Sequence, residues 1–171
     1  MAMCIKFVFL DLDGTLWDCM DISSLEPPFV PISSNTIVDA RGRTVKLFEG
    51  VREFLEKLRE HDLRVVALSW NVKEIAVLAL RAFDIDRYFD DFVIEPHPFK
   101  GYMMRKYFAE RGISVDPNEI LYIDDRDVHL QDIEKNVGRV RFVQMWRDVK
   151  SFEELTDLVM QLVSSCREAG S

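Results

Sequence analysis

The sequence predicts an α/β domain with a doubly wound, mainly parallel sheet. Short apolar runs alternate along the chain with segments in which apolar residues recur at the spacing of an amphipathic helix. Buried strands that alternate with such helices indicate βαβ units and a sheet covered on both faces. A third observation is that polar residues directly follow four of the apolar runs. Because ligands bind outside the carboxyl ends of parallel strands, we expect the functional site at this edge of the sheet.

Length and charge limit the class of protein. The chain has 171 residues, enough for one domain over residues 1–171 with room for a small insertion. Its formal net charge of −8 argues against nucleic-acid binding, which needs basic surface to neutralise phosphates. No apolar stretch approaches the roughly 20 residues that span a bilayer. The first apolar run is too short for a signal peptide and leads straight into acids.

The cysteines give no sign of a metal site. Cys4, Cys19 and Cys166 are widely separated and form no CxxC pair. An odd number of scattered cysteines is typical of a reducing interior, and we expect all three to pack as small apolar side chains. These observations predict a cytoplasmic domain that binds neither nucleic acid nor a membrane, while its oligomeric state is left open.

Predicted strands and helices alternate along most of the chain. Strands are expected over residues 7–10, 64–68, 92–94, 120–123 and 141–145. Helices are expected over residues 51–61, 73–83, 102–111 and about 130–137, with a last helix that starts near residue 151. The first helix is predicted from apolar residues at i, i+3, i+4 and i+7, and the last from a capping box of Ser151 and Glu154.

Residues 17–47 form an insertion between the first strand and the first long helix. Pro27, Pro28 and Pro31 disfavour both a helix and a central strand, so residues 17–32 are expected to be irregular. Residues 36–39 and 44–47 are β-prone and flank a link with a glycine, which predicts a β-hairpin. The insertion is too short for a separate domain, and we expect a small flap over the end of the first strand.

Asp11 and Asp13 follow the first strand directly, and Gly14 lets the chain turn sharply after them. Acids before a glycine are often only turn formers. At the carboxyl end of a buried strand, however, burying their charge costs free energy unless a group of opposite charge pairs with them. Mg²⁺ is a natural partner because it takes carboxylate and carbonyl oxygens.

Three further clusters follow the next strands. They are Ser69-Trp70-Asn71, Lys100 and Asp124-Asp125. With Mg²⁺ bound, these groups suit a phosphoryl site in which Lys100 and Ser69 contact the phosphoryl oxygens. Each has a simpler alternative: Ser69 as a helix cap, Lys100 as a solvated side chain and Asp124 as a helix cap or an acid behind the metal ligand.

The motifs resemble those of the haloacid dehalogenase superfamily of phosphohydrolases over about residues 5 to 150. Asp11-Leu12-Asp13-Gly14-Thr15 is similar to the nucleophile motif, and the other three clusters match the remaining motifs in order. A closer resemblance is to the small magnesium-dependent phosphatases, a nearly capless family with only a hairpin insertion as cover. It is carried by Asp13-Gly14-Thr15-Leu16-Trp17, Pro27-Pro28-Phe29, residues 36–42, Tyr88-Phe89 and Ile123-Asp124-Asp125.

The resemblance implies roles for these residues. Asp11 would be the nucleophile and Asp13 the general acid and base. Mg²⁺ would be held by Asp11, by the main-chain carbonyl of Asp13 and by Asp124 or Asp125, of which Asp125 is the favoured direct ligand. The phosphoryl oxygens would be bound by Leu12, Ser69, Trp70, Asn71 and Lys100.

Four further side chains have weaker assignments. Trp17 directly follows the first motif and is assigned to the substrate wall, with core packing as the alternative. Arg41, in the hairpin, is either a solvated turn residue or a substrate contact. His97 and His129 are expected to be structural or exposed rather than catalytic.

The sequence therefore predicts a Mg²⁺-dependent phosphomonoesterase that works through an aspartyl-phosphate. Its substrate would be a phosphotyrosyl protein or a small sugar phosphate, classes that the family resemblance implies. A phosphomutase is the enzymatic alternative, but it usually needs a larger cap to exclude water. A non-catalytic module that binds phosphoryl groups and metal is the other alternative, although binding alone does not need the acid and base at Asp13.

Overall fold

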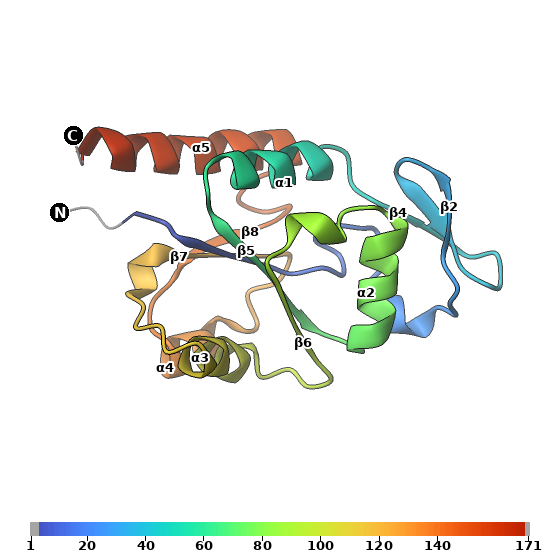
Figure 1. Ribbon diagram of the computed structural model, residues 1–171, viewed down its shortest axis with the longest axis horizontal. Helices are drawn as coiled ribbons and strands as arrows, with labels where there is room; N and C mark the ends of the chain where they lie inside the picture. Colours follow the sequence, from blue (N-terminus) through green and yellow to red (C-terminus); the bar gives the residue numbers. More distant parts are fainter. Residues whose placement is uncertain (1–3, 170–171) are drawn as a thin grey trace.

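The computed structural model describes residues 4–169, with side chains to residue 166. A five-stranded parallel sheet lies at the centre of the molecule (Figure 1). Its strands, in the order in which they lie side by side, are β6 (Asp91–Glu95), β5 (Arg64–Trp70), β1 (Phe7–Leu10), β7 (Ile120–Asp124) and β8 (Arg141–Gln144). The predicted α/β class with a doubly wound parallel sheet is confirmed.

Helices cover both faces of this sheet. They are α1 (Val51–Glu60), α2 (Lys73–Ala82), α3 (Lys100–Glu110), α4 (Leu130–Asn136) and α5 (Phe152–Ala169). Figure 1 shows α1 beside α5 on one face and α3 beside α4 on the other. Single 3-10 turns lie at η1 (Ile22–Ser24), η2 (Asp86–Tyr88) and η3 (Pro117–Glu119). No helix within residues 4–169 is both long and apolar enough to cross a membrane.

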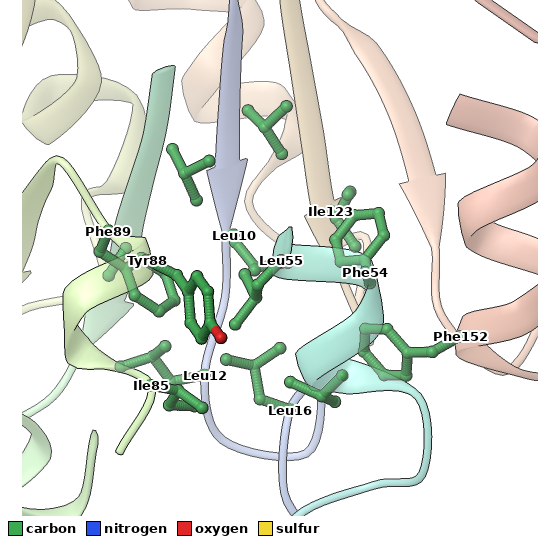
Figure 2. Packing of buried hydrophobic residues seen from close by; sticks show 14 of the residues in the cluster. Leu10, Leu12, Leu16, Phe54, Leu55, Ile85, Tyr88, Phe89, Ile123 and Phe152 are labelled. Carbon is green, nitrogen blue, oxygen red and sulfur yellow. The ribbon is translucent and has the colours of Figure 1, made fainter. Parts of the chain in front are cut away.

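The central strand β1 contributes to two separate hydrophobic cores. Val8 and Leu10 point into the larger core with α1, α2 and α5, whereas Phe7 and Phe9 point into the core with α3. Successive side chains of a strand alternate between faces, so a strand buried on both faces must be apolar at every position. Figure 2 shows the larger core, where Leu10 lies close to Leu55 and Leu12 lies beside Ile85. This packing fixes the strand that carries the first acids.

The insertion contains the predicted hairpin, and an additional strand makes it a three-stranded antiparallel sheet. Its strands are β2 (Val30–Ser33), β3 (Thr36–Val38) and β4 (Thr44–Lys46). The expectation that residues 17–32 are irregular is therefore wrong for β2. Pro31 is tolerated because β2 is an edge strand. The register between β2 and β3 shifts between Pro31 and Ser33. Ile37 and Val45 are buried in the larger core, which ties this flap to the domain.

Two of the three cysteines are paired, contrary to the expectation from sequence. Cys4 and Cys166 form a disulfide with 5.5 Å between their Cα atoms. The start of the described chain and the end of α5 lie at the same side of the molecule (Figure 1). A separation of 162 residues carries no signal of this pairing in the sequence. Because two cysteines form a disulfide, the cysteine pattern no longer supports a reducing compartment.

The buried carboxylate of Asp39 holds the turn of the flap together. It accepts hydrogen bonds from the main-chain nitrogens of Glu26 at 2.9 Å, Arg41 at 3.1 Å and Arg43 at 2.8 Å. It also accepts one from Nε of Arg43 at 2.9 Å. Burial alone would raise the pKa of Asp39, but these donors outweigh it and hold the pKa well below its usual range.

We predict that Asp39→Asn lowers the stability of the protein in a pH-dependent way. A carboxylate whose pKa is depressed by folding stabilises the folded state above its unfolded pKa of about 4, and this contribution is lost as the pH falls. The difference between the wild-type and variant midpoints of urea unfolding should therefore be largest near neutral pH and decrease in acid. Asp157→Asn, an exposed change on α5, is the matched control. A difference that stays constant with pH would contradict this role for Asp39.

Candidate active site

The carboxyl ends of β1, β5 and β7 and the start of α3 surround one cavity of about 430 Å³. Register places the acids side by side, because Leu10 of β1 pairs with Ala67 of β5 and Ile123 of β7. The predicted residues that line the cavity are Asp11, Asp13, Ser69, Trp70, Asn71, Lys100 and Asp125. The predicted convergence of four clusters at the strand ends is therefore present in the structure.

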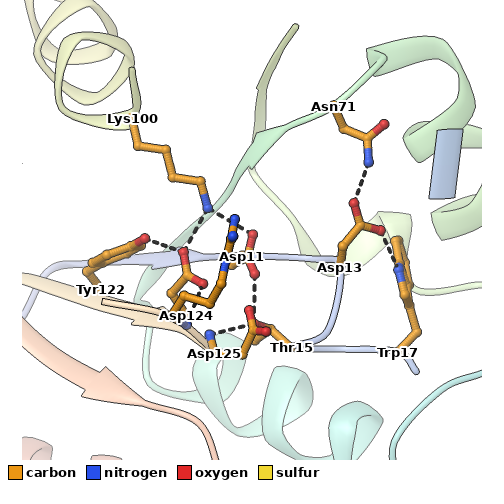
Figure 3. Close-up of polar contacts among 10 residues, drawn as sticks. Asp11, Asp13, Thr15, Trp17, Asn71, Lys100, Tyr122, Asp124 and Asp125 are labelled. Atoms are coloured by element: carbon orange, nitrogen blue, oxygen red, sulfur yellow. Dashed lines mark hydrogen bonds and ion pairs between the residues drawn. The ribbon is translucent and has the colours of Figure 1, made fainter. Parts of the chain in front are cut away.

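Lys100 lies between two buried carboxylates at the base of the cavity (Figure 3). Its Nζ atom donates to Oδ1 of Asp11 at 2.9 Å and to Oδ2 of Asp124 at 2.8 Å. The hydroxyl of Tyr122 donates to the same Oδ2 of Asp124. Burial opposes the charged form of Lys100, but the two carboxylates outweigh it and raise its pKa. Lys100 is thus a buried cation and not a solvated side chain.

Burial and Lys100 oppose each other at both acids, and the net pKa shifts of the two acids have opposite signs. Burial raises the pKa of Asp11 well above its usual value, although Lys100 opposes this shift. Burial would also raise the pKa of Asp124, but Lys100 outweighs it and lowers that pKa to about 2. Asp124 is therefore the more acidic carboxyl of the pair, and additional positive charge near Asp11 would favour its ionised form.

Asp11 and Asp125 are joined through Thr15. The Thr15 hydroxyl donates to Oδ2 of Asp11 at 2.8 Å and accepts from the main-chain nitrogen of Asp125 at 3.0 Å. Carboxylate oxygens of Asp11, Asp124 and Asp125 lie within 4.8 Å of one another. Burial raises the pKa of Asp125 as well. This set of hard oxygen donors fits Mg²⁺, whose charge would favour the ionised carboxylates.

Asp124 and Asp125 differ in how their oxygens are used. Oδ2 of Asp124 is engaged by Lys100 and Tyr122, and Oδ1 accepts from the main-chain nitrogen of Arg126 at 3.0 Å. Asp125 is partly exposed and lines the cavity, whereas Asp124 is buried. This arrangement favours Asp125 as a direct metal ligand and Asp124 as the partner of Lys100.

Gly14 allows the turn to approach Asp125. Its φ angle is +70°, in the left-handed region that favours glycine, and a Cβ atom there would lie 2.6 Å from Oδ2 of Asp125. Its carbonyl accepts from Nε1 of Trp146 at 2.9 Å. A glycine therefore permits both the backbone conformation and the close contact.

Asp13 is held by three hydrogen bonds (Figure 3). Oδ1 accepts from Nε1 of Trp17 at 2.8 Å and from the main-chain nitrogen of Ile22 at 3.0 Å, and Oδ2 accepts from Nδ2 of Asn71. Burial raises the pKa of Asp13 although these donors oppose the shift. The assignment of Trp17 to the substrate wall is wrong, because Trp17 is fully buried and stacks on Phe83.

The remaining predicted residues occupy different places. Ser69 is buried at the cavity and does not cap α2, whose first turn has no side-chain cap. The side chain of Leu12 is buried in the core, so only its backbone is available to a ligand. Arg41 pairs with Glu26 at 2.7 Å in the flap and does not line the cavity, which favours the alternative of a solvated turn residue.

The two histidines also differ in position. His129 is buried and lines the cavity, and burial lowers its pKa, which favours the neutral ring. His97 lies outside the cavity lining and pairs with Glu95 at 3.5 Å. The structural expectation for His129 is compatible with this burial.

Sequence reasoning missed several residues of the site. The further cavity-lining residues are Met20, Asp21, Ser23, Val72, Pro96, Arg126 and His129. Three of these come from the start of the insertion, where only an irregular segment was expected. Thr15 and Tyr122 could have been proposed from their positions, since Thr15 is the last residue of the first motif and Tyr122 precedes Asp124 by two residues.

We predict that Lys100→Met lowers the free energy of unfolding by about 3 kcal/mol or more in metal-free buffer, because two carboxylates lose their buried cation. Urea unfolding followed by circular dichroism measures this change. Lys106→Met on the same helix is the matched control. Its ion pairs are 3.6 and 3.9 Å long and 43% of its side chain is exposed, so a change of about 1 kcal/mol or less is expected. Equal losses in both variants would contradict the role of Lys100.

Comparison with solved structures gives the class of fold. A haloacid dehalogenase superfamily hydrolase from Ehrlichia chaffeensis superposes with a TM-score of 0.67 and 15% identity, covering 94% of this chain and 98% of that one. The N-terminal part of protein BF1531 from Bacteroides fragilis, which contains a phosphatase domain and was crystallised with Mg, has a TM-score of 0.62 and 16% identity. That match covers 94% of this chain but only 40% of the Bacteroides chain. The fold is that of the haloacid dehalogenase superfamily.

Sequence comparison gives the family. The family model described as acid phosphatase matches residues 3–146. Human magnesium-dependent phosphatase 1 is 29% identical over 136 residues, which are 79% of this chain and 76% of the human protein. The chain belongs to the acid phosphatase family, its fold is that of the haloacid dehalogenase superfamily, and the resemblance seen in its motifs is confirmed.

Proposed function

We propose that the protein is a Mg²⁺-dependent phosphomonoesterase with Asp11 as nucleophile and Asp13 as general acid and base. The observation that carries the proposal is that both carboxylates line one cavity together with Lys100 and Ser69. Membership of a phosphatase family and similarity to a magnesium-dependent phosphatase support it.

The donor set supports Mg²⁺ as the cofactor. Asp11, Asp125 and the main-chain carbonyl of Asp13 would hold the ion, and Asp124 would stay paired with Lys100. When bound, the ion would neutralise negative charge on the carboxylates and on the phosphoryl oxygens.

Residues of the chain supply the chemical steps. A carboxylate oxygen of Asp11 attacks phosphorus, and the bond between phosphorus and the leaving oxygen breaks. Asp13 gives its proton to that oxygen, which leaves an aspartyl-phosphate on Asp11. Asp13 then takes a proton from a water molecule that attacks the phosphorus, and inorganic phosphate is released. Lys100 and Ser69 stabilise the phosphoryl oxygens during both steps.

We predict that hydrolysis of p-nitrophenyl phosphate requires Mg²⁺ and stops in EDTA. Asp11→Asn should lower kcat by at least about a thousand-fold, because the amide is a poor nucleophile. Asp157→Asn makes the same chemical change on the exposed side of α5 and should keep full activity. Full activity of Asp11→Asn would exclude the mechanism.

Two alternatives give different outcomes in this assay. A phosphomutase would return the phosphoryl group to a second hydroxyl group and release little inorganic phosphate. A binding module would bind Mg²⁺ without turnover of any ester. The small flap and the presence of Asp13 favour a phosphatase over both.

The rim of the cavity favours an aromatic leaving group. Met20, Trp70 and Val72 line the cavity with exposed fractions of 67%, 50% and 39%. An exposed indole at the edge of a phosphoryl site offers a flat apolar surface for an aromatic ring. We therefore infer phosphotyrosyl-type esters as the preferred substrates over small sugar phosphates.

We predict that Trp70→Ala raises KM for a phosphotyrosine peptide by about 2- to 10-fold, the loss of one aromatic pair. Steady-state kinetics on the peptide and on a panel of sugar phosphates measure the effect. Tyr102→Ala removes an exposed aromatic ring outside the cavity and should leave KM unchanged. Faster turnover of the sugar phosphates, with an equal effect of Trp70→Ala on both classes, would overturn this preference.

A further inference from the structure

The side chain of Asp13 is not free to choose which oxygen faces the cavity. A carboxylate offers about four acceptor positions, two on each oxygen. Both acceptor positions of Oδ1 are occupied, one by the hydrogen bond from Nε1 of Trp17 and the other by the hydrogen bond from the main-chain nitrogen of Ile22. Both donors belong to fully buried residues, so Oδ1 faces the protein interior.

Oδ2 is the oxygen that remains for proton transfer. It accepts one hydrogen bond, from Nδ2 of Asn71, and this occupies one of its two positions. In Figure 3, Asn71 and Trp17 contact different oxygens of the Asp13 carboxylate. The direction of the last acceptor position therefore depends on Asn71.

Asn71 is itself fixed in one orientation. Its Oδ1 atom accepts from the main-chain nitrogen of Val72 at 2.7 Å, so its amide nitrogen points to Asp13. Its main-chain nitrogen donates to the carbonyl of Glu95 at 3.0 Å, which extends the pairing of β5 with β6 by one residue. A side chain at the end of a paired strand gives a more rigid support than a loop residue does.

We infer that Asn71 is the positioning residue of the general acid, an inference that rests on the proposed function. It holds Oδ2 of Asp13 with one position open to the cavity, from which the proton passes to the leaving oxygen. This differs from the role expected from sequence, in which Asn71 binds phosphoryl oxygens. In the step that forms the aspartyl-phosphate, a phosphoryl contact would affect all esters alike, whereas a contact to the acid affects those whose leaving group needs a proton.

A series of esters with different leaving groups tests the inference. We expect Asn71→Ala to lower kcat/KM for alkyl phosphates by about 100-fold, a loss typical of impaired general acid catalysis, and to lower kcat/KM for p-nitrophenyl phosphate far less. The constant kcat/KM covers the steps up to release of the leaving group, so it leaves out the later hydrolysis, in which Asp13 acts as base for every ester. Asn71→Thr places a hydroxyl donor at the same position and should recover part of the alkyl phosphate activity. Ser69→Ala, which removes a contact assigned to the phosphoryl group, is the matched control and should lower both rates by the same factor.

The deciding quantity is the ratio of kcat/KM for the alkyl phosphate to kcat/KM for p-nitrophenyl phosphate within one variant, because partial unfolding lowers both values equally. A ratio that changes in Asn71→Ala but not in Ser69→Ala supports the positioning role. Equal losses for both esters in Asn71→Ala, with a wild-type enzyme that hydrolyses both, would overturn the inference and leave the proposed function intact. A wild-type protein that hydrolyses neither ester in Mg²⁺ would overturn the proposed function, and the inference with it.

Discussion

The buried ion cluster of Lys100 with Asp11 and Asp124 is the interaction on which the site depends. Burying a charge is costly unless it is paired, and here one cation at the start of α3 is shared between acids from two strands. The cluster links α3, β1 and β7 at the edge of the sheet. It also explains why the two acids have different properties, since Asp124 is held ionised while burial raises the pKa of Asp11.

The parallel sheet supplies the other constraint. All five strands point their carboxyl ends to one edge, so the residues that follow β1, β5 and β7 meet without any long loop. The packing of β1 in two cores keeps Asp11 and Asp13 in place. From the insertion, Met20 lines the cavity and the main-chain nitrogen of Ile22 donates a hydrogen bond to Asp13. In the proposed function, residues at the edge of the sheet carry out the chemistry, and the flap and Trp70 at the rim contact the substrate.

Much of the fold was predictable from sequence because the apolar runs and the helical periodicity are strong local signals. The meeting of Asp11, Lys100 and Asp125 was predictable for the same reason, since each follows a strand. The strand β2 was missed because the prolines that exclude a central strand do not exclude an edge strand. The disulfide and the support of Asp13 by Asn71 depend on how distant segments pack, for which the sequence holds no periodic signal.

The central claim is that the phosphoryl group is transferred to Asp11. Rapid acid quenching during turnover of an aryl phosphate in Mg²⁺, followed by proteolysis and mass spectrometry, tests it most directly. The account predicts one added phosphoryl group on the peptide that contains Asp11, located on that side chain and lost when turnover is allowed to finish. Turnover with that peptide unmodified at every quench time, or with the phosphoryl group on another residue, would contradict the account.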